Sequence, residues 1–137
     1  SLQTSFGYIV AEVVEVTVNE GKLSVDRVVA VVDPGYAISP DGMKAQIESG
    51  IIYGLSAALN GEITIENGAV KQSNFHDYSC VRMKDSPAIE TYIINSGEAL
   101  GGAGEPGTPP IAAALTNAIY DATGTRIRQL PVPDIIL

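Results

Sequence analysis

Two valine-rich runs joined by a short polar turn constrain the fold of this chain more than any other feature. In residues 8–18, valines alternate with polar side chains, which is the two-residue period of a half-buried strand. Residues 19–22, Asn-Glu-Gly-Lys, supply turn chemistry, and residues 23–33 resume the valine-rich pattern. The sequence therefore predicts an antiparallel hairpin built from these two runs.

A long helix is predicted from about residue 40 to residue 59. Ser39 suits the N-cap and Pro40 suits the first helical position. An isoleucine or leucine then recurs every four residues from Ile47 to Leu59, which forms one apolar stripe along the helix. This stripe is expected to face the core.

A stripe of small residues runs beside the apolar one and consists of Gln46, Gly50 and Gly54. Each glycine inside a helix costs roughly 1 kcal/mol relative to alanine, so the pair indicates that something approaches this face closely. The neighbour is either another helix or a ligand. If it is a ligand, Gln46 is the residue that would meet it.

The second half of the chain predicts a short hairpin, a long loop and a strand. Asn67-Gly68 is typical of a type I′ hairpin turn. Residues 72–88 show little periodicity and read as a loop of a length that is often functional. Residues 89–95 have the apolar content of a strand.

A second helix is expected to start at Pro109 or Pro110, with Thr108 as its cap, and to end at Gly124. Its apolar face would consist of Ile111, Leu115 and Ile119.

These elements predict an α+β fold in which antiparallel hairpins pack with two main helices. Because the composition does not change along the sequence, residues 1–137 are expected to form a single domain. The tail, residues 130–137, is too rich in proline for regular structure and apolar enough to pack on a neighbouring surface.

Charge and composition exclude several classes of function. A net charge of −8 argues against binding to a nucleic-acid backbone, which needs clustered lysine and arginine. No apolar run approaches the roughly 20 residues of a membrane-spanning helix. Cys80 and His76 are the only residues of their types, so an ordinary structural zinc site and an internal disulfide are excluded. No export signal is present in this sequence, and its cellular location is left open.

The most distinctive site candidate is a glycine-flanked carboxylate, Glu105, in the stretch 101–110. Glycines leave the carboxylate unobstructed, and Pro106 and its neighbouring prolines restrict the loop. A carboxylate held in this way can act as a base, as a partner for a charged group or as a metal ligand. The residue pattern alone leaves these three roles open.

At this point the order of motifs resembles the C-terminal part of the molybdenum-binding subunit of the xanthine oxidase, or molybdenum hydroxylase, family. The motifs are, in order, Ser5-Phe6-Gly7 before the valine-rich hairpin, Val31-Val32-Asp33-Pro34-Gly35, Pro40 followed by Gln46-Ile47-Glu48-Ser49-Gly50 and Gly54-Leu55, and Gly104-Glu105-Pro106 before an alanine-rich helix. The run Asn74-Phe75-His76-Asp77-Tyr78, with Arg82-Met83 soon after it, is similar to the isoquinoline 1-oxidoreductase β-subunit branch.

The resemblance implies a molybdopterin cofactor with molybdenum, in its cytosine dinucleotide form, bound mainly by residues outside this chain. The metal is then held by the cofactor and not by protein side chains. Glu105 matches the family base that takes a proton from the oxygen attacking an electron-poor carbon. Gln46 matches a glutamine that hydrogen-bonds near the cofactor, and Gly104, which precedes Glu105 in the Gly-Glu-Pro motif, is the second residue implied to bind the cofactor.

The implied function is that of a C-terminal fragment of a larger molybdopterin-binding domain. The whole enzyme would oxidise an aldehyde or an N-heterocycle with water as the oxygen source, and the fragment alone would be inactive. The implied partners are the remainder of the molybdenum-binding subunit, an iron-sulfur subunit or domain, and a small-molecule substrate. The alternative is a small acidic α+β binding or assembly module in which Glu105 has no catalytic role.

Overall fold

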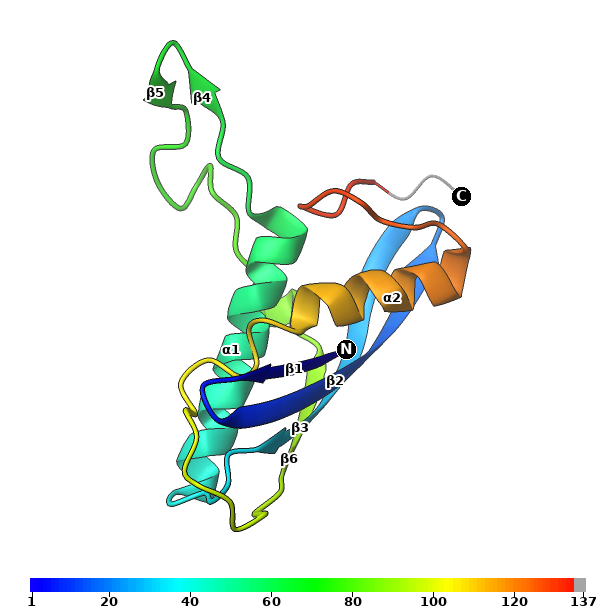
Figure 1. Ribbon diagram of the computed structural model, residues 1–137. Coiled ribbons are helices and arrows are strands. Elements are labelled where there is room, and N and C mark those ends of the chain that lie inside the picture. The colour runs from blue at the N-terminus through cyan, green and yellow to red at the C-terminus, as the bar shows by residue number, and fades with distance from the viewer. Residues whose placement is uncertain (135–137) are drawn as a thin grey trace.

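A four-stranded sheet in the order β1-β2-β3-β6 forms the centre of the structure (Figure 1). The computed structural model describes residues 1–134. The strands are β1 (Leu2–Ser5), β2 (Tyr8–Asn19), β3 (Lys22–Asp33) and β6 (Ala88–Ile93). β1 and β3 each pair with β2 in antiparallel orientation, and β6 pairs with β3 in parallel.

The predicted valine-rich hairpin is confirmed as β2 and β3. Glu20 and Gly21 have positive φ angles of 50° and 77°, as a type I′ turn requires, so the two strands join in a tight hairpin. Every second residue of β2 from Tyr8 to Val14 is buried, so one face of the sheet is covered.

Two helices cover that face. Helix α1 (Pro40–Asn60) contacts β6, and α2 (Ile111–Thr123) contacts β2. The apolar stripes predicted for both helices are confirmed, since Leu59 at the end of the α1 stripe is partly buried and the other members are fully buried, namely Ile47, Ile51, Leu55, Ile111, Leu115 and Ile119. The α+β class with two main helices is therefore confirmed.

The predicted start of the second helix is wrong. The N-cap residue is Pro110, not Thr108. The Thr108 side chain is engaged elsewhere, because its Oγ1 donates a hydrogen bond to the Gly50 carbonyl at 3.2 Å. The predicted end is confirmed, since Gly124 caps the helix in the left-handed conformation with a φ of 73°.

The turn at Asn67-Gly68 is confirmed between β4 (Ile65–Glu66) and β5 (Ala69–Val70), with φ angles of 52° and 80°. This hairpin projects from the end of α1, away from the sheet (Figure 1). The loop that follows contains one 3₁₀ turn, Met83–Asp85.

The final residues of the described chain run back to α1. The amide of Val132 donates a hydrogen bond to the Ala58 carbonyl at 2.8 Å, so this part of the tail packs on the chain itself. The expectation for residues 135–137 lies outside the described residues. Neither α1 nor α2 has the length and apolarity that a bilayer-spanning helix needs.

Candidate functional site

The glycine loop lies between β6 and α2 and is tied to the sheet through its backbone. The Gly101 amide donates to the Pro34 carbonyl and the Gly102 amide donates to the Phe6 carbonyl, both at 2.8 Å. Pro34 directly follows β3, and Phe6 lies in the turn between β1 and β2. Two segments distant in sequence therefore hold the first half of the loop.

A carboxylate at the end of β3 accepts hydrogen bonds from the residues after β3 and from the segment that leads to the glycine loop. Asp33, at the end of β3, accepts hydrogen bonds from the Gly35 amide and from the Ser96 hydroxyl, both at 2.9 Å. These hydrogen bonds, the one from Gly35 first, lower the pKa of Asp33 below its usual value. The ionised group thus joins the end of β3 to the segment after β6.

The small-residue stripe of α1 meets the second half of the loop. A Cβ added to Gly50 would lie 3.1 Å from the Thr108 hydroxyl, and one added to Gly54 would collide with the Ile111 side chain. Within the described residues, the close neighbour is therefore the start of α2 and the loop before it. Of the two expectations, packing explains Gly50 and Gly54.

Gln46, at the N-terminal end of the same stripe, makes a different contact. Its Nε2 donates a hydrogen bond to the Gly104 carbonyl at 2.6 Å. Both residues are exposed, and a Cβ added to Gly104 would meet nothing within 4 Å, so the space beside this contact is open. The structure thus brings together Gln46, Gly104 and the adjacent Glu105.

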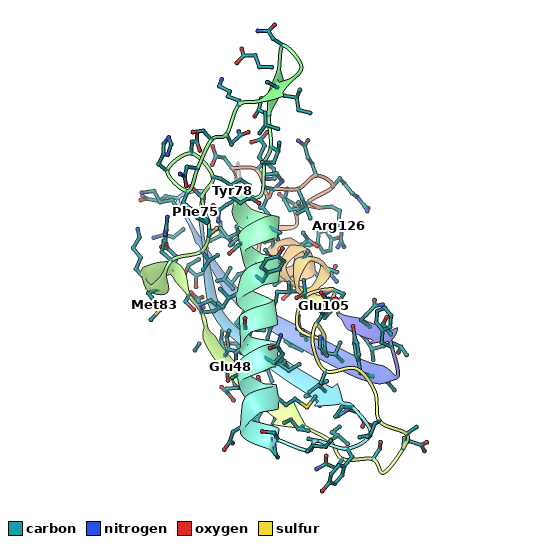
Figure 2. The ribbon with its side chains drawn as sticks, turned by 90° about the vertical axis from the view of Figure 1, so that its left-hand side faces the viewer. Glu48, Phe75, Tyr78, Met83, Glu105 and Arg126 are labelled. Atoms are coloured by element: carbon teal, nitrogen blue, oxygen red, sulfur yellow. The ribbon has the colours of Figure 1, made fainter. Side chains whose placement is uncertain are left out.

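The Glu105 side chain is exposed, and hydrogen bonding and burial hold the backbone turn that carries it. Its carbonyl accepts a hydrogen bond from the Thr108 amide at 2.9 Å, which closes a turn, and Pro106 and Gly107 within that turn are buried. Figure 2 shows Glu105 on the segment beside α1. The backbone at Glu105 is fixed while its carboxylate remains accessible, which is the arrangement a base or a charged binding group needs.

A cavity of about 350 Å³ lies between the start of α1 and the glycine loop. Its lining includes Tyr36, Ile38, Met43, Gln46 and Ala103. The wall is mainly apolar with one amide, which is the usual character of a small-molecule pocket.

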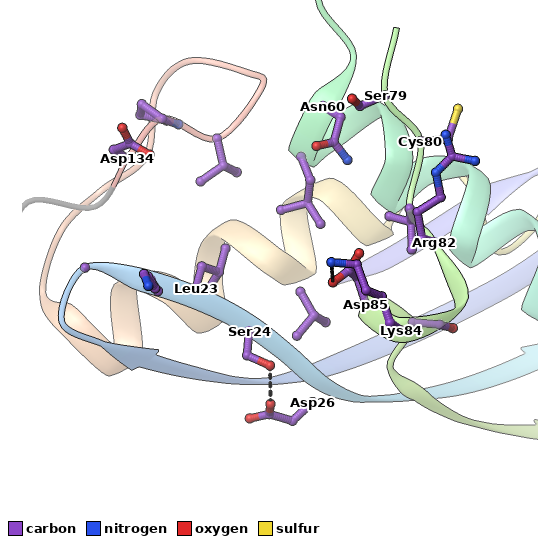
Figure 3. A pocket seen from close by; sticks show the side chains of 18 residues that line it. Leu23, Ser24, Asp26, Asn60, Ser79, Cys80, Arg82, Lys84, Asp85 and Asp134 are labelled. Atoms are coloured by element: carbon purple, nitrogen blue, oxygen red, sulfur yellow. Dashed lines mark hydrogen bonds and ion pairs between the residues drawn. The ribbon is translucent and has the colours of Figure 1, made fainter. Parts of the chain in front are cut away.

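A larger cavity of about 1000 Å³ lies elsewhere, around the β2–β3 turn, the end of α1 and the segment 79–86 (Figure 3). Two of its acidic groups are already paired, since the Ser24 hydroxyl donates to Asp26 at 2.7 Å and Lys84 lies 3.7 Å from Asp85. Neither Glu105 nor Gln46 lines this cavity. The smaller cavity is the one beside the candidate residues, because Gln46 lines it and donates a hydrogen bond to the Gly104 carbonyl.

No group of three or more His, Cys, Asp or Glu side chains within residues 1–134 is placed to hold a metal ion. The polar groups that adjoin one another are the Gln46 amide, which is bonded to the Gly104 carbonyl, and the exposed carboxylate of the next residue, Glu105, beside the open space at Gly104. Such a set can hydrogen-bond a bulky polar cofactor without ligating its metal. The residues present therefore fit a cofactor that carries its own metal ligands.

Glu12, which is not among the residues predicted from the sequence, places a carboxyl group in the core face of the sheet. Glu12 is 1% exposed, and neither of its carboxyl oxygens has a hydrogen-bond partner within residues 1–134. Burial raises its pKa to about 8. The signal was available, because Glu12 has the same alternation as the buried Val10 and Val14.

Comparisons with known proteins show which family the chain resembles. Residues 1–87 match a family model described as a molybdopterin cofactor-binding domain. The chain is 42% identical over 125 residues to the isoquinoline 1-oxidoreductase subunit beta of Brevundimonas diminuta, an alignment covering 90% of this chain and 16% of that relative. It is 34% identical over 118 residues to a putative xanthine dehydrogenase molybdenum-binding subunit of Escherichia coli strain K12, covering 81% of this chain and 16% of the relative.

A solved structure supports the fold. The Cu,Mo-CO dehydrogenase in its carbon monoxide reduced state matches with a TM-score of 0.72 at 20% identity, over 90% of this chain and 17% of that chain. The chain thus spans about one sixth of the length of each of these three proteins.

Proposed function

The chain belongs to the molybdopterin cofactor-binding domain family of molybdenum-binding subunits in the xanthine oxidase class, and we propose that it is the C-terminal part of a molybdenum hydroxylase. The whole enzyme oxidises an aldehyde or an N-heterocycle with water as the oxygen source. Residues 1–137 act as one domain of that enzyme and are inactive alone. The high identity to an isoquinoline 1-oxidoreductase subunit supports this assignment.

The observation that carries the proposal is the exposed carboxylate of Glu105 on a backbone fixed from three sides. The sheet holds Gly101 and Gly102, the Gln46 amide holds Gly104, and the 105–108 turn closes on the other side. When bound, the molybdopterin cofactor supplies a redox-active molybdenum centre that accepts two electrons from the substrate. Glu105 accepts, at its carboxylate, the proton of the attacking water oxygen.

Gln46 and Gly104 form the contact surface for the cofactor. The Gln46 side chain lines the cavity beside the loop, and the open space next to Gly104 lets a bulky group approach the backbone. Because the hydrogen bond between these two residues fixes the amide, its orientation is set before the cofactor binds. We assign the cofactor as the cytosine dinucleotide form of molybdopterin.

The partners in this proposal are the remainder of the molybdenum-binding subunit and an iron-sulfur subunit or domain. The remainder is required because this chain spans 16% of its isoquinoline relative. The iron-sulfur partner removes electrons after each turnover.

The test is Glu105→Gln in the full-length protein, with molybdenum content and turnover measured on the same sample. The amide keeps the shape of the side chain but cannot accept the proton, so we expect turnover to fall by about 10²–10⁴-fold at unchanged molybdenum content. Glu98→Gln is the matched control, because Glu98 is an exposed carboxylate earlier in the same loop. Near-normal turnover of Glu105→Gln would reject the base assignment, and full-length protein without molybdenum would favour a non-catalytic acidic module.

A further inference from the structure

The sheet face that points away from the helices carries an apolar stripe across all four strands. The strand registers place Leu2 opposite Ala11, Ala11 opposite Val31, and Val31 opposite Tyr92. These four residues form one continuous row, because paired residues on neighbouring strands point to the same side. We call this side of the sheet the open face.

Neighbouring positions extend the stripe along the strands. Val13 and Val29 form the next pair along the strands, and Ile9 lies on the same face, two residues before Ala11. The exposed fractions are 66% for Leu2, 65% for Val13, 54% for Tyr92 and 48% for Ile9. Single exposed apolar residues are ordinary, but a contiguous set across four paired strands marks an interaction surface.

Charged groups border the stripe at one end. Arg27 lies between two carboxylates, with Nη1 2.8 Å from Glu15 and Nε 2.7 Å from Glu90. The Tyr92 hydroxyl donates to the second oxygen of Glu90 at 3.0 Å. An apolar centre with a polar rim is the anatomy of a protein interface, and this rim has an excess of one negative charge.

The composition of the stripe indicates what covers it. The paired residues of the stripe carry no charge, and they are Leu2, Ala11, Val13, Val29 and Val31. Uncharged apolar centres of this kind are typical of permanent interfaces, which resemble the interior of a domain. A sheet that is apolar on both faces needs a layer on each side. Within residues 1–134 the helices supply only one of these layers.

We infer that the open face packs against another part of the same molybdenum-binding subunit, through an apolar layer rimmed by basic side chains. The inference rests on the proposed function, since the 16% coverage of the isoquinoline relative leaves most of such a subunit outside this chain. The net negative rim at Glu15, Arg27 and Glu90 selects a basic counterpart. The turn between β1 and β2, whose Phe6 carbonyl accepts the hydrogen bond from the Gly102 amide, joins two of the strands that carry this face.

The experiment is photo-crosslinking in the full-length assembled protein. Tyr92→p-benzoylphenylalanine places a crosslinker of similar shape on the open face, and Val13→p-benzoylphenylalanine provides a second position on it. After irradiation and digestion, mass spectrometry identifies the attached peptides. We expect both positions to crosslink within the same polypeptide, to one neighbouring segment outside residues 1–137 that contains lysine or arginine.

Tyr53 supplies the matched control, because it is 72% exposed but lies on α1, on the other side of the sheet. The same crosslinker at Tyr53 should attach to a different segment or to none. Crosslinks from the open face only to the iron-sulfur subunit, only to a second copy, or to no protein would overturn the inference. The molybdenum content of the same protein separates the inference about the open face from the proposed function. If the open face crosslinks within the polypeptide but the protein holds no molybdenum, only the proposed function is rejected.

Discussion

At the scale of single residues, Glu12 predicts an unusual dependence of stability on pH. Its pKa is about 8 in the folded chain against an ordinary 4.5. Between these values the folded state keeps a proton that the unfolded chain has released. The free energy of unfolding is therefore expected to fall by about 1.4 kcal/mol per pH unit as the pH rises from about 5 towards 8.

Glu12→Gln should remove this slope, because glutamine has a similar shape and does not ionise. The measurement is urea unfolding of the chain at several pH values between 5 and 8. Glu62→Gln is the control, since Glu62 is an exposed carboxylate outside the sheet. Equal slopes for the Glu12→Gln variant and the unmodified chain would show that Glu12 is not the buried titrating group.

At the scale of secondary structure elements, the packing of α1 against the start of α2 can be tested at Gly54. Gly54→Ala introduces a Cβ that collides with the Ile111 side chain and lies 3.0 Å from the Thr108 carbonyl. Overpacking of a core contact typically costs about 1–3 kcal/mol, which exceeds the gain of about 1 kcal/mol in helix propensity. We expect net destabilisation, measured as a lower urea midpoint.

Ser49→Ala is the control for helix propensity, because Ser49 is exposed on the same helix. It should leave stability nearly unchanged or raise it slightly. A Gly54→Ala variant at least as stable as Ser49→Ala would contradict the close packing of α1 against α2.

The sequence predicted those elements that local periodicity and turn chemistry define. The β2–β3 hairpin, the Asn67-Gly68 turn, α1 and the end of α2 at Gly124 follow from patterns within a few residues. The cap at Thr108 was wrong because a tertiary contact with Gly50 takes its hydroxyl. The parallel pairing of β3 with β6 joins segments more than 50 residues apart, so no local pattern could show it.

The sequence predicted which residues lie near one another at the candidate site, but it did not predict the groups that surround them. The motifs brought Gln46, Gly104 and Glu105 together, and the structure places them in one group through the bond from Gln46 to Gly104. Their catalytic and cofactor-binding roles stay predictions. Glu12 was not among the predicted site residues, because no motif surrounds it and it lies at a core position of a strand, where an apolar side chain is expected.

At the scale of the whole molecule, the described residues form a sheet with one covered face and one open face. The helices complete the core on the covered face, the glycine loop presents Glu105, and the open face carries exposed apolar side chains.

The most direct test of this account is the rate at which ¹⁸O passes from labelled water into product, measured in the full-length protein with an aldehyde or N-heterocycle that it oxidises. We expect the unmodified protein to place ¹⁸O from water in the product. Glu105→Gln, at equal molybdenum content, should incorporate the label at least about 100-fold more slowly. Incorporation at the unmodified rate in the variant, or product oxygen derived from O₂, would contradict the account.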